Sequence, residues 1–248
     1  MTALYSETFG SGDPTLVLLH GVGANGAVFR RLVEALQWPG RVVVPDLRGH
    51  GRSPHARHYG MAHHAADVAD LFAAGERIHV VGHSMGGAVA LVLASGLFDV
   101  AVERVSAFGV KLRWTAEEIA KAEAFAASPV RWFETREAAA ERFLRVAGLM
   151  GLVPADDPAV EAGLRAEGGR FRLAADNATV GAGKASADVM MGMARAPKQL
   201  FSGAGDAMVT AEDLRAFDPR AFAIDGGHNI HVEAPAQVAD AIRSFHLR

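Results

Sequence analysis

The sequence predicts an α/β protein built on a mostly parallel, twisted sheet with helices on its faces. Two observations support this prediction. Apolar runs alternate with amphipathic segments up to about residue 110, and the same alternation returns after about residue 199. Strands that are buried on both faces of a parallel sheet read as near-continuous apolar runs. Their alternation with helices indicates right-handed crossover connections within one open sheet.

Six apolar runs are the candidate strands of this sheet. They cover residues 15–20 (TLVLLH), 41–46 (RVVVPD), 78–83 (IHVVGH), 105–110, 199–204 (QLFSGA) and 221–225 (AFAID). Three segments are candidate helices, because their apolar residues recur at helical spacing on one face. These faces are formed by Val28, Phe29, Leu32, Val33 and Leu36, by Met61, Ala65, Val68, Leu71 and Phe72, and by Val238, Ile242 and Phe245.

The segment between the two α/β parts breaks this rhythm and is predicted to be a helical insertion. It has no run with the pattern of a strand, and it carries the N-terminal signals of three helices. These signals are Thr115 with Glu118, Thr135, and Asp157 before Pro158. We therefore expect a core formed by residues 1–112 and 196–248, with residues 113–195 as an inserted cap.

The composition excludes several classes of chemistry and partner. The 248 residues include no cysteine, which excludes a thiol nucleophile, Cys-ligated zinc, iron–sulfur clusters and disulfides. A net charge of −3 gives no reason to expect nucleic acid or an anionic membrane as a partner. The first residues lack the basic and apolar regions of a signal peptide, and the longest apolar stretch, 86–98, is too short to span a bilayer. We expect a cytoplasmic protein and predict no oligomeric state.

One motif points to nucleophilic catalysis. Residues 82–87 (GHSMGG) contain the pattern G-x-S-x-G between a predicted strand and a predicted helix. Such a turn is sharp enough to strain the serine backbone and to lift its hydroxyl above the sheet. Ser84 is therefore the candidate nucleophile. The amide of Met85 begins the helix without an intrahelical partner, so it is a candidate oxyanion donor.

A second oxyanion donor is expected in the loop after the first apolar run. Residues 20–23 (HGVG) form this loop, and its glycines allow a close approach of the backbone to a ligand. The amide of Val22 is our candidate.

A serine hydroxyl needs a base, and the base needs a carboxylate to orient it. His228 follows the predicted strand 221–225 and is the candidate base, with His231 as the alternative. Asp206 follows the predicted strand 199–204 and is the candidate acid. Both lie at carboxyl ends of strands, where open α/β sheets bind ligands. The alternatives for the acid are Asp225 and Asp213.

Together these motifs resemble the α/β-hydrolase superfamily, specifically its capped, esterase-like serine hydrolase branch. The resemblance lies in residues 20–21, 45–53 (PDLRGHGRS), 82–87 and 227–228, with Glu233 and Pro235 following. It implies a helical cap inserted after the sixth strand, lying over the pocket. It also implies that Ser84, Asp206 and His228 form a triad, and that Asp46, Arg48 and His50 are architectural. Dehalogenases and epoxide hydrolases of this superfamily have aspartate where this chain has Ser84.

The expected function is hydrolysis of a small carboxylic ester through an acyl-enzyme, without a metal or organic cofactor. Trp114, Trp132 and Met190 are candidate substrate contacts in the apolar cap. A local group of histidines, His55, His58, His63 and His64, is expected to be solvated rather than metal-binding. Three alternatives stay open: a carbon–carbon bond hydrolase of a diketone or dienoic substrate, a thioesterase or lactonase, and a non-catalytic receptor on the same fold.

Overall fold

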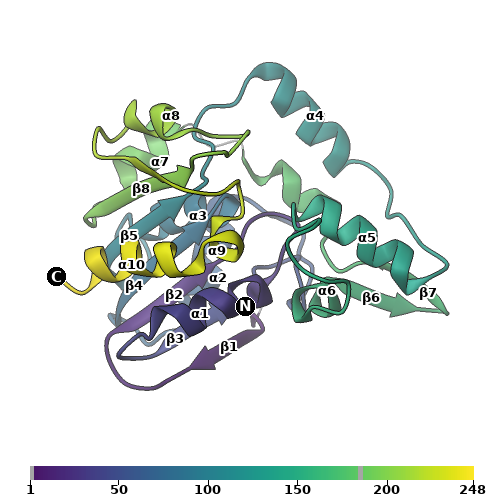
Figure 1. Ribbon diagram of the computed structural model, residues 1–248, viewed down its shortest axis with the longest axis horizontal. Helices are drawn as coiled ribbons and strands as arrows, with labels where there is room; N and C mark the ends of the chain where they lie inside the picture. Colours follow the sequence, from purple (N-terminus) through teal and green to yellow (C-terminus); the bar gives the residue numbers. More distant parts are fainter. Residues whose placement is uncertain (1–2, 184–186) are drawn as a thin grey trace.

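A seven-stranded, mostly parallel sheet with helices on both faces forms the centre of the molecule (Figure 1). The computed structural model describes residues 3–183 and 187–248; residues 1, 2 and 184–186, expected in core and cap, lie outside it. The strands are β1 (Ser6–Phe9), β2 (Thr15–Leu19), β3 (Val42–Pro45), β4 (Arg77–His83), β5 (Ala101–Phe108), β8 (Lys198–Gly203) and β9 (Phe222–Ile224). Their order is β1-β3-β2-β4-β5-β8-β9, and only the β1–β3 pair is antiparallel.

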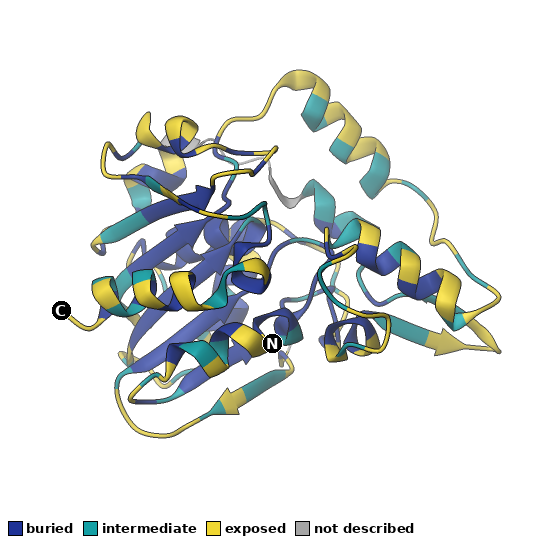
Figure 2. Cartoon of the chain, viewed as in Figure 1, coloured by how far each residue is buried: buried dark blue, intermediate teal, exposed yellow. Residues whose placement is uncertain are grey.

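The side chains of strand β2 show why the central strands are apolar throughout. Val17 and Leu19 pack toward α2 (Met61–Ala69) and α3 (Met85–Leu93). Leu16 and Leu18 point to the opposite face, in the cluster that contains residues of α1 (Arg30–Leu36) and α10 (Pro235–His246). Successive side chains of a strand alternate between the two faces. Both faces of the sheet are therefore buried (Figure 2).

The predicted fold class is confirmed, with two differences in the strands. Strand β1 is not among the six apolar runs because it is a short edge strand, mostly half-buried, with the sequence SETF. The insertion follows β5, the fifth strand along the chain, rather than the expected sixth. In the described chain one strand, β1, precedes β2, so the strand before the insertion is the fifth along the chain.

Three helices of the insertion, α4 (Ala116–Ala126), α5 (Arg136–Val146) and α6 (Pro158–Ala162), begin at the predicted N-caps. The 3-10 helix η2 (Asn177–Gly183) and the helix α7 (Ala187–Met193) follow them. Thr115, Thr135 and Asp157 each accept a hydrogen bond from a backbone amide at the start of α4, α5 and α6 respectively. Helix α4 buries none of its residues and lies apart from the sheet in Figure 2.

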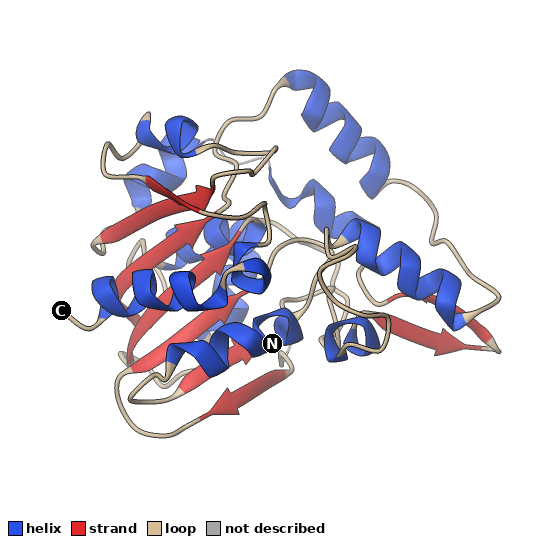
Figure 3. Cartoon of the chain, viewed as in Figure 1, coloured by secondary structure: helices blue, strands red, loops and turns tan. Residues whose placement is uncertain are grey.

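The insertion is not purely helical, which corrects the expectation that it has no strand. Strands β6 (Leu164–Glu167) and β7 (Arg170–Leu173) form an antiparallel hairpin, visible in red beside the core in Figure 3. Gly168 and Gly169 join them with φ angles of 58° and 78°. A two-residue hairpin turn needs positive φ at both positions, so the Gly-Gly pair was the available signal.

The expected boundaries at 112/113 and 195/196 fall in the loops that join β5 to α4 and α7 to β8. We propose these loops as the ends of a cap. The remaining helices are η1 (Gly26–Phe29), α8 (Ala211–Arg215) and α9 (Ile230–Glu233). Within residues 3–183 and 187–248, no helix has the length and apolar character needed to cross a membrane.

Candidate active site

Ser84 occupies a strained turn between β4 and α3. Its φ and ψ are 52° and −118°, a conformation that costs a non-glycine residue about 1–3 kcal/mol. The turn is sharp because the backbones on either side approach closely. A Cβ atom on Gly82 would lie 2.1 Å from the carbonyl oxygen of Gly86, and one on Gly86 would lie 2.2 Å from that of Leu19. Only glycine fits at both positions, as a nucleophile elbow requires.

Asp206 and His228 form a hydrogen-bonded pair on neighbouring loops. His228 Nδ1 donates to Asp206 Oδ2 over 2.8 Å, while Asp206 Oδ1 accepts from the amides of Met208 (2.8 Å) and Val209 (3.3 Å). The Asp206 carboxylate is fully buried, and 21% of the His228 side chain is exposed. Burial raises the pKa of Asp206, but these hydrogen bonds outweigh it and lower the pKa below the usual value. The ionised carboxylate fixes the proton of His228 on Nδ1, which leaves Nε2 as a base.

The backbones of these two loops are tied to each other. Ala204 N donates to Ile224 O (2.7 Å) and Gly205 N donates to Gly226 O (2.8 Å). The His228 loop is also held by Glu233, whose Oε2 accepts from Gly227 N at 2.9 Å. The distance between the candidate base and acid is therefore set by main-chain contacts at the ends of β8 and β9.

His83, which the sequence reasoning did not single out, anchors the base loop to the elbow. Its Nε2 donates to the backbone carbonyl of His228 over 2.9 Å, and the two rings lie 4.7 Å apart. Burial holds the pKa of His83 well below its usual value, so the ring stays neutral. The available signal was a polar residue that ends the apolar run 78–83, directly before Ser84.

The two candidate oxyanion donors face the elbow from different elements. Met85 is the first residue of α3, and Val22 follows strand β2. Within the described chain neither amide donates a hydrogen bond. The Val22 loop lies against the elbow, since a Cβ on Gly21 would be 3.2 Å from Ser84 Cβ. His20 holds this loop, because its Nδ1 donates to Gly21 O over 2.8 Å.

One small cavity of about 80 Å³ lies at Ser84, although Asp206 and His228 are not among its lining residues. Ser84, Val22 and Met85 line it, and so do Trp114 and Met190 of the insertion. Its other lining residues are Met61, Ala88, Val110, Lys111, Thr179, Val180 and Met208. Trp132 is not among them. Its ring packs under Arg170 and Arg172, whose guanidinium carbons lie 5.1 Å and 5.7 Å from the ring centroid.

No hydrogen bond to Ser84 Oγ occurs among the described residues. The structure therefore pairs Asp206 with His228 and gathers Ser84, Val22 and Met85 around one cavity, but leaves the serine–histidine contact unmade. Catalytic hydrogen bonds are often long without substrate and tighten when it binds.

A family model described as the alpha/beta hydrolase family matches residues 16–241 of the sequence. The chain belongs to the α/β-hydrolase family. The match covers both parts of the sheet from β2 onward, the elbow, the acid and base loops and the insertion.

Curated relatives match this α/β-hydrolase over shorter stretches. The magnesium-chelatase 30 kDa subunit of Rhodobacter capsulatus is 41% identical over 106 residues, which are 40% of this chain and 35% of that protein. The pimeloyl-[acyl-carrier protein] methyl ester esterase of Vibrio campbellii is 45% identical over 95 residues, 38% of this chain and 35% of that protein. The chain thus spans about a third of the length of these relatives.

Solved structures resemble the α/β-hydrolase over its whole length. E-2-(acetamidomethylene)succinate hydrolase has a TM-score of 0.81 at 24% identity, covering 99% of this chain and 95% of the other. A thioesterase domain from the curacin biosynthetic pathway has a TM-score of 0.76 at 22% identity, covering 97% and 99%. At these identities the likeness concerns the fold.

The alternative site residues of this α/β-hydrolase lie in other surroundings. The ring of His231 is buried without a hydrogen-bond partner among the described residues, and burial lowers its pKa to about 3. Asp213 accepts from Thr210 in the capping box of α8, and Asp225 is exposed. No group of three or more histidine or acidic residues in the described chain is arranged to hold a metal ion. In the local group of histidines that was expected to be solvated, His64 is instead buried.

Proposed function

We propose that the protein is a serine hydrolase that cleaves a small carboxylic ester through an acyl-enzyme. The observation that carries this proposal is the Asp206–His228 hydrogen bond on the loops beside a serine held in a strained elbow. A buried carboxylate that fixes the tautomer of an imidazole, next to an activated hydroxyl, is the arrangement that acyl transfer requires.

In the proposed mechanism, His228 Nε2 removes the proton of Ser84 Oγ as this oxygen attacks the ester carbonyl carbon. The amides of Met85 and Val22 bind the oxyanion of the tetrahedral intermediate; one such donor is worth about 10²–10³-fold in rate. His228 then gives its proton to the departing alkoxide, which leaves as an alcohol. Water, deprotonated by His228, attacks the acyl-enzyme and releases the carboxylic acid and free Ser84.

The proposed substrate has a small apolar group beside the scissile bond. The cavity at Ser84 holds about 80 Å³ and most of its lining residues are apolar. This volume is small compared with the roughly 300–1,000 Å³ of ordinary ligand pockets. Relatives named as methyl ester esterases support an ester rather than a thioester, lactone or diketone.

A labelling experiment tests the proposal. The purified protein and Ser84→Ala are treated with a fluorophosphonate probe and assayed with p-nitrophenyl acetate. We expect labelling and turnover only with Ser84 present. A folded wild-type protein that neither reacts with the probe nor turns over the ester would be a receptor rather than a hydrolase. If the protein turns over diketones or thioesters in preference to esters, the proposed substrate class is wrong, while the assignment of Ser84 as the nucleophile still holds.

A further inference from the structure

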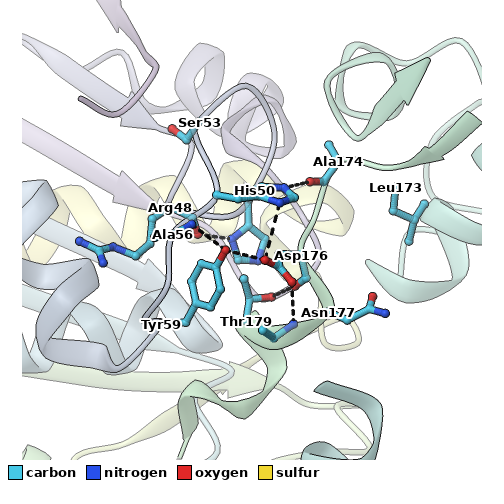
Figure 4. A network of polar contacts seen from close by, with 12 residues as sticks. Arg48, His50, Ser53, Ala56, Tyr59, Leu173, Ala174, Asp176, Asn177 and Thr179 are labelled. Carbon is cyan, nitrogen blue, oxygen red and sulfur yellow. Dashed lines mark hydrogen bonds and ion pairs between the residues drawn. The ribbon is translucent and has the colours of Figure 1, made fainter. Parts of the chain in front are cut away.

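Tyr59 of the core and Asp176 of the cap meet beside the candidate active site. The Tyr59 hydroxyl donates to Asp176 Oδ2 over 2.7 Å, although the residues are 117 positions apart in the sequence. The same hydroxyl accepts from Ala56 N at 2.9 Å, which directs its proton toward Asp176. Figure 4 shows the two side chains pointing toward each other from the two parts of the molecule.

Asp176 links the core loop to the start of η2 through both its side chain and its backbone. Its amide donates to Gly49 O over 2.8 Å, and its Oδ2 lies 3.6 Å from His55 Nδ1. On the side of η2, Oδ1 accepts from Ala178 N at 3.0 Å. The backbone carbonyl of Asp176 accepts from Thr179 N at 3.1 Å and Thr179 Oγ1 at 2.7 Å. One residue therefore fixes the first turn of η2 against the core.

This turn forms one wall of the cavity that contains Ser84. Thr179 and Val180 line the cavity from the cap, while Met61 lines it from the start of α2. Met61 is two residues after Tyr59. The Tyr59–Asp176 contact thus lies between the cap wall and the core wall of the cavity.

Burial keeps the Tyr59 hydroxyl protonated over the ordinary pH range. Tyr59 is only 7% exposed. Burial, and then the hydrogen bond to Asp176, raise the pKa of the Tyr59 phenol well above its usual value, so the hydroxyl keeps its proton. A hydrogen bond to a carboxylate is stronger than one between neutral groups, and this one is half-buried, since 29% of the Asp176 side chain is exposed.

We propose that Asp176 is a positioning residue that sets the width of the acyl pocket by holding Thr179 and Val180 at a fixed distance from the core. This inference rests on the proposed esterase activity of the same cavity. It assigns acyl-chain selection to a cap–core hydrogen bond outside the triad.

Arg165 offers a matched control. Its Nη2 donates to Gly51 O (3.0 Å) and Ser53 O (3.2 Å), so it also ties cap to core. It does so from the hairpin strand β6, and within the described chain its side chain makes no hydrogen bond to η2. Arg165→Gln removes these two guanidinium hydrogen bonds between cap and core, and it changes no residue that lines the cavity.

The experiment compares Tyr59→Phe, Asp176→Ala, Asp176→Asn and Arg165→Gln on p-nitrophenyl acetate, butyrate and octanoate. For Tyr59→Phe and Asp176→Ala we expect KM for acetate to rise about five- to tenfold, the factor of one ordinary hydrogen bond. The octanoate-to-acetate ratio of kcat/KM should rise by a similar factor, with the pH profile of kcat unchanged. Asp176→Asn keeps an acceptor for the Tyr59 hydroxyl and should restore most of the wild-type ratio. The double variant Tyr59→Phe/Asp176→Ala should add nothing to Asp176→Ala alone.

Hydrogen exchange separates this inference from the proposed function. In Tyr59→Phe and Asp176→Ala the amides of Ala178 and Thr179 should exchange faster than in the wild type, whereas Arg165→Gln should not change them. Unchanged exchange overturns the positioning role, whether or not Ser84 reacts with the fluorophosphonate. Faster exchange with an unchanged chain-length ratio in an active enzyme overturns the assignment of pocket width. If the fluorophosphonate does not label wild-type Ser84, the proposed esterase activity is overturned. The hydrogen exchange of Ala178 and Thr179 then still decides whether Asp176 is a positioning residue.

Discussion

The imidazole of His83 donates a hydrogen bond to the backbone carbonyl of His228, 145 positions later in the chain. The residue directly before the candidate nucleophile thus holds the loop that carries the candidate base. The last residue of β4 therefore helps to fix the position of the ring that must meet Ser84.

We expect His83→Ala to lower kcat by about 10–100-fold, because displacement of a catalytic group by about 1 Å costs this much. The fluorophosphonate should still label Ser84, but more slowly. His79→Gln, another histidine of β4 that contacts His246 rather than the base loop, serves as the control and should keep its kcat. Equal losses in both variants would mean that the effect comes from damage to the strand.

Ser84→Ala should abolish turnover without loss of stability, since the serine carries strain rather than a stabilising hydrogen bond. Ser84→Gly removes the side chain that makes φ of 52° unfavourable. We expect it to be more stable than Ser84→Ala by about 1 kcal/mol, or about 2–4 °C in Tm. Calorimetry of the three proteins measures this order. A Ser84→Gly protein less stable than Ser84→Ala would show that the elbow is unstrained.

Asp206→Asn should lower kcat by about 10⁴-fold, because an amide in this place favours the wrong tautomer of His228. The amide of asparagine has nearly the same shape as the carboxylate of aspartate, so KM should change little. The matched variants are Asp213→Asn, which alters the capping box at the N-terminus of α8, and Asp225→Asn, which changes an exposed residue. Each should keep kcat within a factor of about two, since neither contacts His228. If Asp206→Asn were fully active and one of the other two variants were not, that other aspartate would be assigned as the residue that orients His228.

Stability should fall steeply in mild acid because several histidines are buried uncharged. Burial lowers the pKa of His20 to about 4 and those of His50, His64 and His246 to about 3. In the unfolded chain they titrate near 6.5, so below that pH the unfolded state binds more protons. Each then removes up to about 1.4 kcal/mol of unfolding free energy per pH unit, until the folded pKa is reached. Above about pH 7.5 this contribution is constant.

Urea unfolding at about pH 8.5, 7.5, 6 and 5 measures this dependence. The midpoint should stay level between the two higher values and drop between the two lower ones. Replacement of the buried His50 by Gln should flatten the slope, whereas replacement of the exposed His63 should leave it unchanged. A midpoint that is level down to about pH 5 would contradict the prediction.

The strands of the core and the turn at Ser84 were predictable because their signals are local. Apolar runs such as 15–20 lie buried on both faces, and the elbow of Ser84 needs glycines at fixed offsets. The parts that were missed depend on contacts far apart in the sequence. Strand β1 is held by pairing with β3 at an edge. Trp132 was expected in the pocket because it is aromatic, yet its packing is decided by the arginines of β7.

All three candidate triad residues and both oxyanion amides belong to the part of the chain outside residues 113–195. The insertion supplies part of the cavity wall. Besides the two loops, several hydrogen bonds join it to the core, among them those of Tyr59 and Arg165 and those of Asn25 with Ala159 O and Asn229 with Gly148 O. The candidate catalytic residues and part of the cavity wall therefore lie in separate segments of the chain. A chimera that exchanges this insertion would acquire a new substrate range without rebuilding its nucleophile, which makes residues 113–195 the place to begin directed evolution.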